Sequence, residues 1–188
     1  SATTAFLPQK LGIAHGTSHA TPEGVKALVT SVLLSTIAST AAAYQIKTTS
    51  AGTAVRWPDG AVEFKVDESV GAGEVEAIRA SFEAWSRVAK VELTFSGTTN
   101  RADTGYDPRQ GSANENVVRF ARTKWEADRA TLAVTFTLYE TTSGKVISSD
   151  IVLNAVNYRW TTTGEAGMED VQNTVAHEAG HFIGLGHS

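Results

Sequence analysis

The chain has 188 residues, of which 41% are hydrophobic and 19% are charged, and its formal net charge at pH 7 is −4. This composition is typical of a globular domain and argues against a fibrous or disordered chain. The absence of a basic cluster argues against a nucleic-acid partner, and the absence of cysteine excludes disulfides, thiolate nucleophiles and cysteine-type zinc sites.

Residues 25–43 have the pattern of a secretory signal peptide. Lys26 precedes an apolar run of about a dozen residues, and Ala41-Ala42-Ala43 end it as a cleavage site would. The alternatives are a core helix or a membrane span, although a span needs about 20 apolar residues. Cleavage after this run predicts a secreted protein without a stable membrane anchor. We interpret residues 1–24 as upstream read-through or a disordered segment, with translation beginning at or near Val25.

Residues 44–60 are interpreted as a polar, threonine-rich leader segment that ends in the turn Pro58-Asp59-Gly60. The folded domain is predicted over residues 61–188. Val62, Phe64 and Val66 alternate with polar residues at its start, as the side chains of a half-buried strand do.

A helix is predicted over residues 73–90, because apolar side chains recur there at helical spacing. The members of this stripe are Val75, Ile78, Phe82, Trp85 and Ala89. A second strand, 91–95, follows the helix. Strand, helix and strand in this order predict a right-handed crossover and parallel pairing.

Residues 97–115 are almost entirely polar and predict a long surface loop, after which 116–120 form a short strand. Residues 130–140 alternate between apolar and polar side chains, and a turn joins them to the strand 146–154 as a hairpin. The sequence therefore predicts a mixed, mostly parallel sheet in which the first hairpin strand lies at the edge with free backbone groups. We interpret Asp150, in the second hairpin strand, as an anchor that hydrogen-bonds a loop.

The chain closes with HEAGHFIGLGHS, in which three histidines have the spacing of metal ligands. His177 and His181 are four residues apart, so a helix beginning near Glu169 and Asp170 projects both imidazoles from one face. Gly184 is a natural helix stop, beyond which the chain can turn back and present His187. Three histidine ligands leave the fourth position of a tetrahedral zinc ion open, which is the catalytic arrangement.

Glu178 lies about 100° around the helix from His177, so it is poorly placed as a fourth ligand. It can instead hydrogen-bond a zinc-bound water and act as a general base. A single histidine is more often a packing residue, and HExxH alone recurs by chance. Here, however, five fixed positions of H-E-x-x-H-x-x-G-x-x-H coincide.

With this motif the sequence resembles the metzincin metalloendopeptidases, and Ser188 after the third histidine is similar to the matrixins among them. The resemblance implies an α+β fold with α/β character: a five-stranded mixed sheet with an antiparallel edge strand and two helices, the second carrying the zinc motif. It implies His177, His181 and His187 as ligands of one catalytic Zn²⁺, and Glu178 as the general base. It also implies that an extended substrate pairs with the edge strand; we expect that contact at Leu132, Ala133, Val134 and Thr135.

The sequence departs from this family in several respects. No methionine follows His187, so the Met-turn of the family is not in this chain, and no cysteine is available for a cysteine-switch propeptide. The segment 121–129 has no histidine for a structural zinc, and the sequence gives no support for calcium. We therefore expect a minimal catalytic domain truncated after the zinc motif.

The predicted function is a zinc-dependent endopeptidase that acts on extended proteins or peptides, as a secreted monomer. Two alternatives stay open. One is a catalytically weak domain that binds zinc or peptide, and the other is a zinc hydrolase with a different substrate.

Overall fold

The computed structural model describes residues 3–5, 45–58, 60–101, 104–105, 107, 109–110 and 114–187. The proposed signal peptide, 25–43, lies outside the described residues, as does most of the segment 1–24. Within the described parts of the chain, no helix has the length and apolar character needed to cross a membrane.

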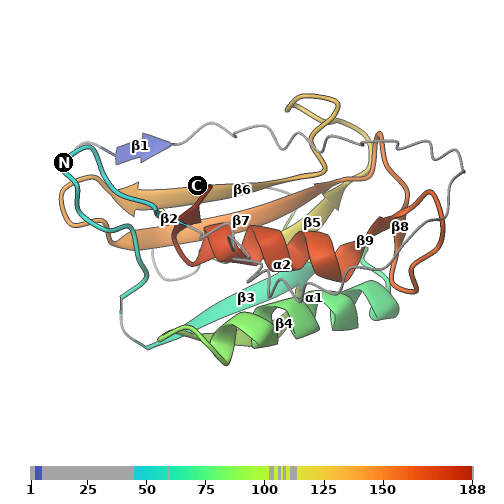
Figure 1. The fold of residues 1–188 in the computed structure, drawn as a ribbon, viewed down its shortest axis with the longest axis horizontal. Coiled ribbons are helices and arrows are strands. Elements are labelled where there is room, and N and C mark those ends of the chain that lie inside the picture. The colour runs from blue at the N-terminus through green and yellow to red at the C-terminus, as the bar shows by residue number, and fades with distance from the viewer. Residues whose placement is uncertain are drawn as a thin grey trace, which may run out of the picture.

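A twisted mixed sheet forms the centre of the fold (Figure 1). Its five main strands are β3 (Ala61–Asp67), β4 (Glu92–Thr99), β5 (Val117–Ala121), β6 (Ala133–Glu140) and β7 (Val146–Asn154). They lie in the order β6-β7-β5-β3-β4, with β6 antiparallel to β7 and all other pairs parallel. The predicted mixed sheet with an antiparallel hairpin strand is therefore confirmed. A short strand, β1 (Thr3–Ala5), pairs antiparallel with the Leu138–Glu140 end of β6.

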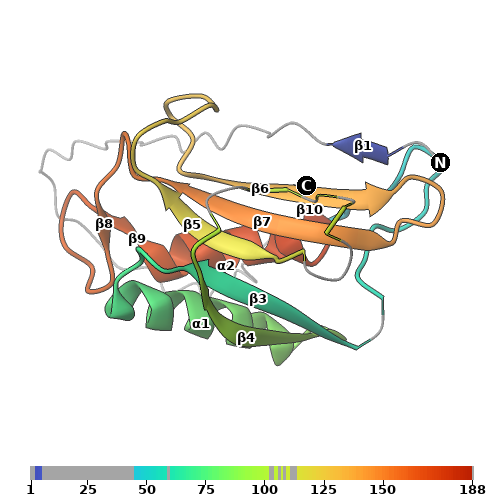
Figure 2. The same ribbon diagram turned by 180° about the vertical axis from the view of Figure 1, so that it is seen from behind.

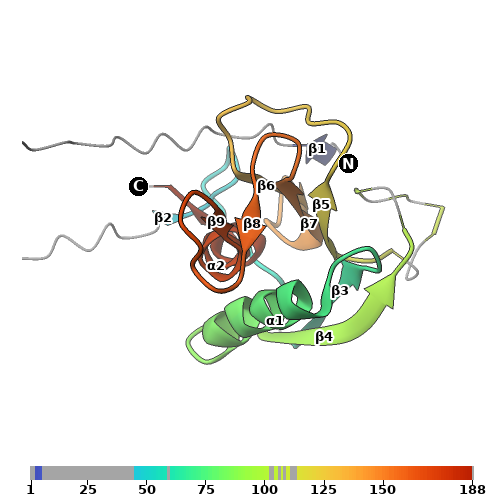
Figure 3. The same ribbon diagram turned by 90° about the vertical axis from the view of Figure 1, so that its right-hand side faces the viewer.

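Two helices, α1 (Ala72–Ser86) and α2 (Val171–Phe182), cover one face of the sheet (Figure 3). Figure 2 shows the opposite face of the sheet, with both helices behind it. The predicted first helix is confirmed, but it ends at Ser86 rather than at Lys90. It stops there because the chain turns into β4, where the Leu93 backbone N–H donates to Ser86 Oγ at 2.9 Å.

A row of aromatic rings joins the sheet to both helices. Phe64 of β3 stacks on Phe82 of α1 with ring centroids 3.8 Å apart, and Phe82 meets Phe182 of α2 edge-on at 5.2 Å. Trp57 packs on the far side of Phe182 at 5.4 Å. Phe64, Phe82 and Phe182 are at most 2% exposed, so this row lies in the core and fixes α2 relative to the sheet.

Residues 45–58, in the segment interpreted as a leader, pack beside the end of the chain. Strand β2 (Gln45–Ile46) pairs antiparallel with β10 (Leu185–Gly186), and the Lys47 N–H donates to the Gly184 carbonyl at 2.9 Å. Val55 is 1% exposed. A second small pairing, β8 (Trp160–Thr161) with β9 (Glu169–Asp170), lies at the start of α2. Both ends of α2 are thus held by short strand pairs.

Candidate metal centre

Helix α2 forms where the sequence predicted it and is anchored along its length. Asp170 is its N-cap, and Asp170 Oδ1 accepts a hydrogen bond from the Asn173 backbone N–H at 2.7 Å. Two tryptophan side chains donate to α2 carbonyl groups: Trp85 Nε1–H to Ala176 O at 2.7 Å and Trp57 Nε1–H to Phe182 O at 2.8 Å. These long-range bonds fix the rotation of the helix about its axis, and with it the direction of the histidines.

The three histidines converge on one point. His177 and His181 lie one turn apart on α2, with their Nε2 atoms 3.1 Å from each other. Gly184 ends the helix with φ +99°, a conformation that favours glycine, and β10 then brings His187 back over the helix. His187 Nε2 lies 3.1 Å from His177 Nε2 and 2.9 Å from His181 Nε2.

This convergence fits a divalent metal better than it fits hydrogen bonding. A neutral imidazole carries only one N–H, so three Nε2 atoms in mutual contact cannot all be satisfied by one another. Zinc binds histidine nitrogen at about 2.0–2.1 Å, which places tetrahedral ligand atoms about 3.3 Å apart. The observed separations of 2.9–3.1 Å are close to this value. The donor set and its spacing therefore suit zinc.

The protein environment keeps these rings neutral, as metal ligands must be. Burial lowers the pKa of His177 to about 4, with further lowering from the charges of His181 and His187. Burial also lowers the pKa values of His181 and His187. Leu185 O lies 2.8 Å from His181 Nδ1, so it accepts the proton of that nitrogen and leaves the Nε2 lone pair directed at the centre.

Glu178 lies beside the histidines but faces the edge of the sheet. It is 7% exposed, and Oε2 accepts a hydrogen bond from Thr135 Oγ1 of β6 at 2.6 Å. The same hydroxyl lies 3.1 Å from the Glu178 carbonyl oxygen. Burial raises the pKa of Glu178 to about 7, although the Thr135 hydrogen bond acts in the opposite direction. A carboxyl group with a pKa near neutrality can both accept and return a proton at physiological pH.

The edge strand β6 passes next to Glu178 with part of its backbone free. Leu132 O accepts from the Asn154 N–H, and residues 132 and 154 stand directly opposite in the hairpin register. Hydrogen-bonded and outward-facing residues alternate in antiparallel pairs. Ala133 and Thr135 therefore direct their N–H and C=O groups away from β7, whereas Leu132 and Val134 direct theirs towards it.

A pocket of about 270 Å³ lies between this edge and the first half of α2. Its lining includes Leu132 and Ala133 from the edge, His177 and Glu178 from the metal centre, and Asn173 one turn earlier on the helix. The pocket therefore opens directly onto the region where the three histidines and Glu178 meet. A side chain of an extended ligand paired with β6 would fit there.

The structure brings together the three histidines, Glu178 and the edge strand. Sequence reasoning missed the hydrogen bond from Thr135 to Glu178, because nothing in the sequence links two residues so far apart. It also missed the contact of residues 45–47 with the turn that carries His187. The polar sequence of that segment gave no sign of burial, and only its neighbour Val55-Arg56-Trp57 carries an apolar signal.

Comparison with known protein families adds an independent finding. The sequence model of a family described as Matrixin matches residues 57–188 of this chain. The match covers both helices, the five main strands and all three histidines. A search of curated proteins found no match.

Proposed function

Because the chain belongs to the matrixin family of zinc metallopeptidases, we propose that it cleaves internal peptide bonds of extended polypeptides with one zinc ion, held by His177, His181 and His187. Family membership makes it a hydrolase of the metalloendopeptidase type. The observation that carries the residue assignment is the convergence of three histidine Nε2 atoms within 3.1 Å of one another, beside a buried glutamate.

Each side chain has a distinct role in this proposal. The three imidazoles hold the metal, and the Leu185 carbonyl orients the ring of His181 through Nδ1. Zinc bound there would lower the pKa of a water molecule and polarise the scissile carbonyl group. Glu178 removes a proton from the attacking water and returns it to the nitrogen of the leaving amine. Thr135 holds the Glu178 carboxylate in one orientation by donating to Oε2.

The substrate in this proposal adds a strand to the sheet. The outward N–H and C=O groups of Ala133 and Thr135 bind the substrate backbone, in the way that an open sheet edge captures an extended peptide. Leu132 and Val134 flank these contacts and keep β6 paired with β7. One substrate side chain enters the 270 Å³ pocket beside His177. Because main-chain hydrogen bonds are independent of side-chain identity, side-chain selectivity comes from the pockets next to β6.

We also propose that the enzyme acts as a monomer outside the cell. The signal-peptide pattern of residues 25–43 supports secretion. N-terminal sequencing of protein recovered from culture medium, together with light scattering, tests both statements.

The decisive experiment compares the unmodified protein with Glu178→Gln. We expect one zinc per chain in both proteins, and a loss of casein or peptide hydrolysis of about 100-fold or more in the variant. The Gln side chain keeps the size of Glu178 but cannot accept the proton. If the unmodified protein binds zinc and peptide but cleaves neither casein nor peptides, the peptidase assignment is wrong and the chain is a binding domain. Hydrolysis confined to esters or small amides would indicate a different zinc hydrolase.

A further inference from the structure

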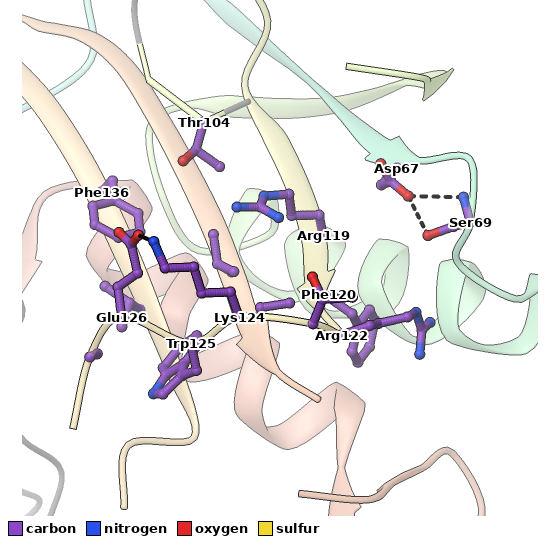
Figure 4. Close-up of a pocket in the computed structure, with 15 residues that line it drawn as sticks. Asp67, Ser69, Thr104, Arg119, Phe120, Arg122, Lys124, Trp125, Glu126 and Phe136 are labelled. Atoms are coloured by element: carbon purple, nitrogen blue, oxygen red, sulfur yellow. Dashed lines mark hydrogen bonds and ion pairs between the residues drawn. The ribbon is translucent and has the colours of Figure 1, made fainter. Parts of the chain in front are cut away.

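A second pocket, of about 420 Å³, lies on the face of the sheet that the helices leave uncovered (Figure 4). Successive side chains of a strand point to opposite faces of the sheet. Ala133, Ile151 and Leu153 belong to the core under the helices. Their neighbours Val134 and Val152 therefore face the other way and line this pocket. Its wall is the segment 122–127, the first part of the connection between β5 and β6. We call it the outer pocket.

Arg119 of β5 lies in the middle of the outer pocket (Figure 4). Its Nε–H is buried and makes no hydrogen bond, and no described residue forms a hydrogen bond or ion pair with its guanidinium. The side chain as a whole is only partly buried, so a ligand can reach it. A guanidinium removed from water without an acceptor is unfavourable, and an anion that pairs with it relieves that cost.

Among the described residues, the carboxylates that line the outer pocket or interact electrostatically with Arg119 make their hydrogen bonds with other groups. Glu126 pairs with Lys124 at 2.6 Å, and Asp67 Oδ1 accepts from both the backbone N–H and the hydroxyl of Ser69. The charge of Arg119 acts to lower the pKa values of both Glu126 and Asp150, but the two oxygens of Asp150 accept from backbone N–H groups of β5 and the preceding loop. Within the described parts of the chain, no acceptor pairs with the Arg119 guanidinium, which leaves it available to an acidic group of a ligand.

The rest of the outer pocket combines positive charge with apolar surface. Arg122 lies at its rim, 48% exposed, with a guanidinium nitrogen 3.9 Å from Glu74 Oε2 and the guanidinium carbon 5.1 Å from the centre of the Phe120 ring. Phe136 is 40% exposed although it belongs to β6, and Trp125, which lines the same pocket, is half-buried. Figure 4 shows Arg119 between Arg122 on one side and the Lys124–Glu126 pair on the other. This combination suits a carboxylate attached to a partly apolar chain.

The outer pocket is connected to the metal centre through β6. Thr135 contacts Glu178 on the helix face of this strand, and the next residue, Phe136, lines the outer pocket on the other face. Side chains of an extended polypeptide alternate between the two faces of a sheet. A polypeptide paired with β6 for cleavage can therefore pass some of its side chains over the edge to the outer pocket while others face Glu178.

We propose that the outer pocket is an exosite that binds an acidic side chain of the polypeptide substrate through Arg119, with neighbouring apolar substrate atoms packed on Phe136 and Trp125. Arg122, at the rim, adds a second positive charge near Arg119. This inference rests on the proposed function for the identity of the ligand, but the binding itself does not require cleavage. The enzyme would thus prefer polypeptides in which acidic and apolar residues follow each other near the cleaved bond.

Binding is tested first with two blocked peptides, acetyl-Glu-Phe-Glu-Phe-Glu-amide and its counterpart with Gln in place of Glu. They are titrated into the zinc-loaded Glu178→Gln protein, and binding is followed by NMR at the indole N–H of Trp125, assigned with Trp125→Phe. We expect the Glu peptide to bind about tenfold more tightly than the Gln peptide, because charge-assisted hydrogen bonds are stronger than neutral ones. Equal affinities in this protein would overturn the exosite, and this comparison needs no change in the pocket.

The role of Arg119 is tested with Arg119→Met, which keeps the length of the side chain and removes its charge. The matched control is Arg129→Met, the same substitution at an exposed arginine that does not line the pocket. Arg119→Met should abolish the preference for the Glu peptide, and Arg129→Met should preserve it. A preference that survives Arg119→Met would show that Arg119 is not the binding group.

Measurements of cleavage kinetics distinguish a failure of the exosite from a failure of the proposed peptidase function. With fluorogenic substrates that carry the same Glu or Gln flanks, Arg119→Met should raise KM several-fold for the Glu substrate only and leave kcat unchanged. Unchanged KM values for both substrates would contradict the exosite but would leave the proposed peptidase function uncontradicted. If the protein cleaves neither substrate but binds the Glu peptide through Arg119, the exosite stands as a binding site and the peptidase function fails.

Discussion

The Thr135 hydroxyl and the Glu178 carboxylate form the shortest link between the edge strand and the metal centre. Oγ1 lies 2.6 Å from Oε2 and 3.1 Å from the backbone oxygen of the same glutamate. One hydroxyl has a single proton to donate, and the shorter distance assigns it to the carboxylate. Thr135 is therefore a positioning residue, which acts on the reaction through Glu178.

Thr135→Val should lower kcat for peptide hydrolysis by about tenfold, with little change in KM or zinc content, because the carboxylate loses its orienting donor. Valine has nearly the same shape as threonine, so packing against α2 is kept. The matched control is Thr137→Val on the same face of β6, where the hydroxyl bonds Ser149 rather than Glu178. Equal losses of kcat in the two variants would contradict a positioning role for Thr135.

Asp150 is the second residue whose role the structure defines. It is 1% exposed, and its carboxylate accepts from the Val117 N–H at 2.7 Å and the Gly105 N–H at 2.6 Å. The interpretation of Asp150 as a loop anchor is thus confirmed, since Gly105 belongs to the loop between β4 and β5. Burial raises the pKa of Asp150 above its ordinary value, and the two N–H donors offset this only in part.

The pKa of Asp150 has a consequence for stability. Between the unfolded value of 3.8 and the higher folded value, the folded protein binds more protons than the unfolded chain. The stability that this carboxyl group contributes is fully present below about pH 4 and is lost as the pH rises through the folded value. We expect the difference in unfolding free energy between the unmodified protein and Asp150→Asn to shrink as the pH rises from about 4 towards neutrality. Urea unfolding in excess chelator measures this without metal release, and a difference that grows with pH would contradict it.

At the scale of elements, the turn after α2 depends on a distant segment of the chain. Gly184 has φ +99°, and a Cβ atom added there would lie 2.1 Å from the Val55 carbonyl oxygen. The β2–β10 pair continues this contact as far as Gly186, next to His187. Residues 45–55 therefore hold the third histidine in place, although they lie more than a hundred positions away in sequence.

Gly184→Ala should weaken zinc binding by at least about tenfold, because the added Cβ displaces either the turn or the Val55 backbone and moves His187. Competition with a fluorescent zinc chelator measures the affinity. The matched control is Gly164→Ala, which shares a positive φ of 77° but has no atom within 4 Å of the added Cβ. If Gly184→Ala binds zinc as tightly as this control, the turn does not need its contact with residues 45–55.

At the scale of the whole molecule, the metal site joins helix α2 to the turn that the segment 45–58 holds in place. Two ligands lie on α2, and the third lies beyond β10, which the segment 45–58 holds. On the other side of α2, the rings of Phe182, Phe82 and Phe64 connect the helix to α1 and the sheet. A metal bound to all three histidines should therefore stabilise the folded chain as one unit.

Removal of zinc with a chelator should lower the melting temperature by about 5–10 °C, because the metal binds the folded state in preference to the unfolded one. The shift should grow with the concentration of free zinc and should vanish in His181→Ala, which removes the central ligand. Differential scanning calorimetry gives the comparison. A melting temperature that is independent of zinc in the unmodified protein would mean that the three histidines do not share an ion.

The sequence by itself determined the local geometry of this protein. Helical spacing places His177 and His181 on one face whatever surrounds them, and alternation of side chains predicts β3 and β6, because both periods follow from backbone geometry. The turn after β6 predicts β7 as its hairpin partner. The same local rules predicted that the helix would stop at Gly184. They overestimated the length of α1, since apolar spacing continues past the point where Ser86 Oγ binds the start of β4.

Only the tertiary structure decided which distant groups meet. The hydrogen bond from Thr135 to Glu178, the contact of residues 45–47 with the turn before His187, and the burial of Arg119 Nε–H without an acceptor among the described residues all depend on packing between elements. Spacing along a helix or strand is fixed by covalent geometry and short-range hydrogen bonds. Contacts across the fold depend instead on how the complete set of side chains fills the core, and no short stretch of sequence encodes that.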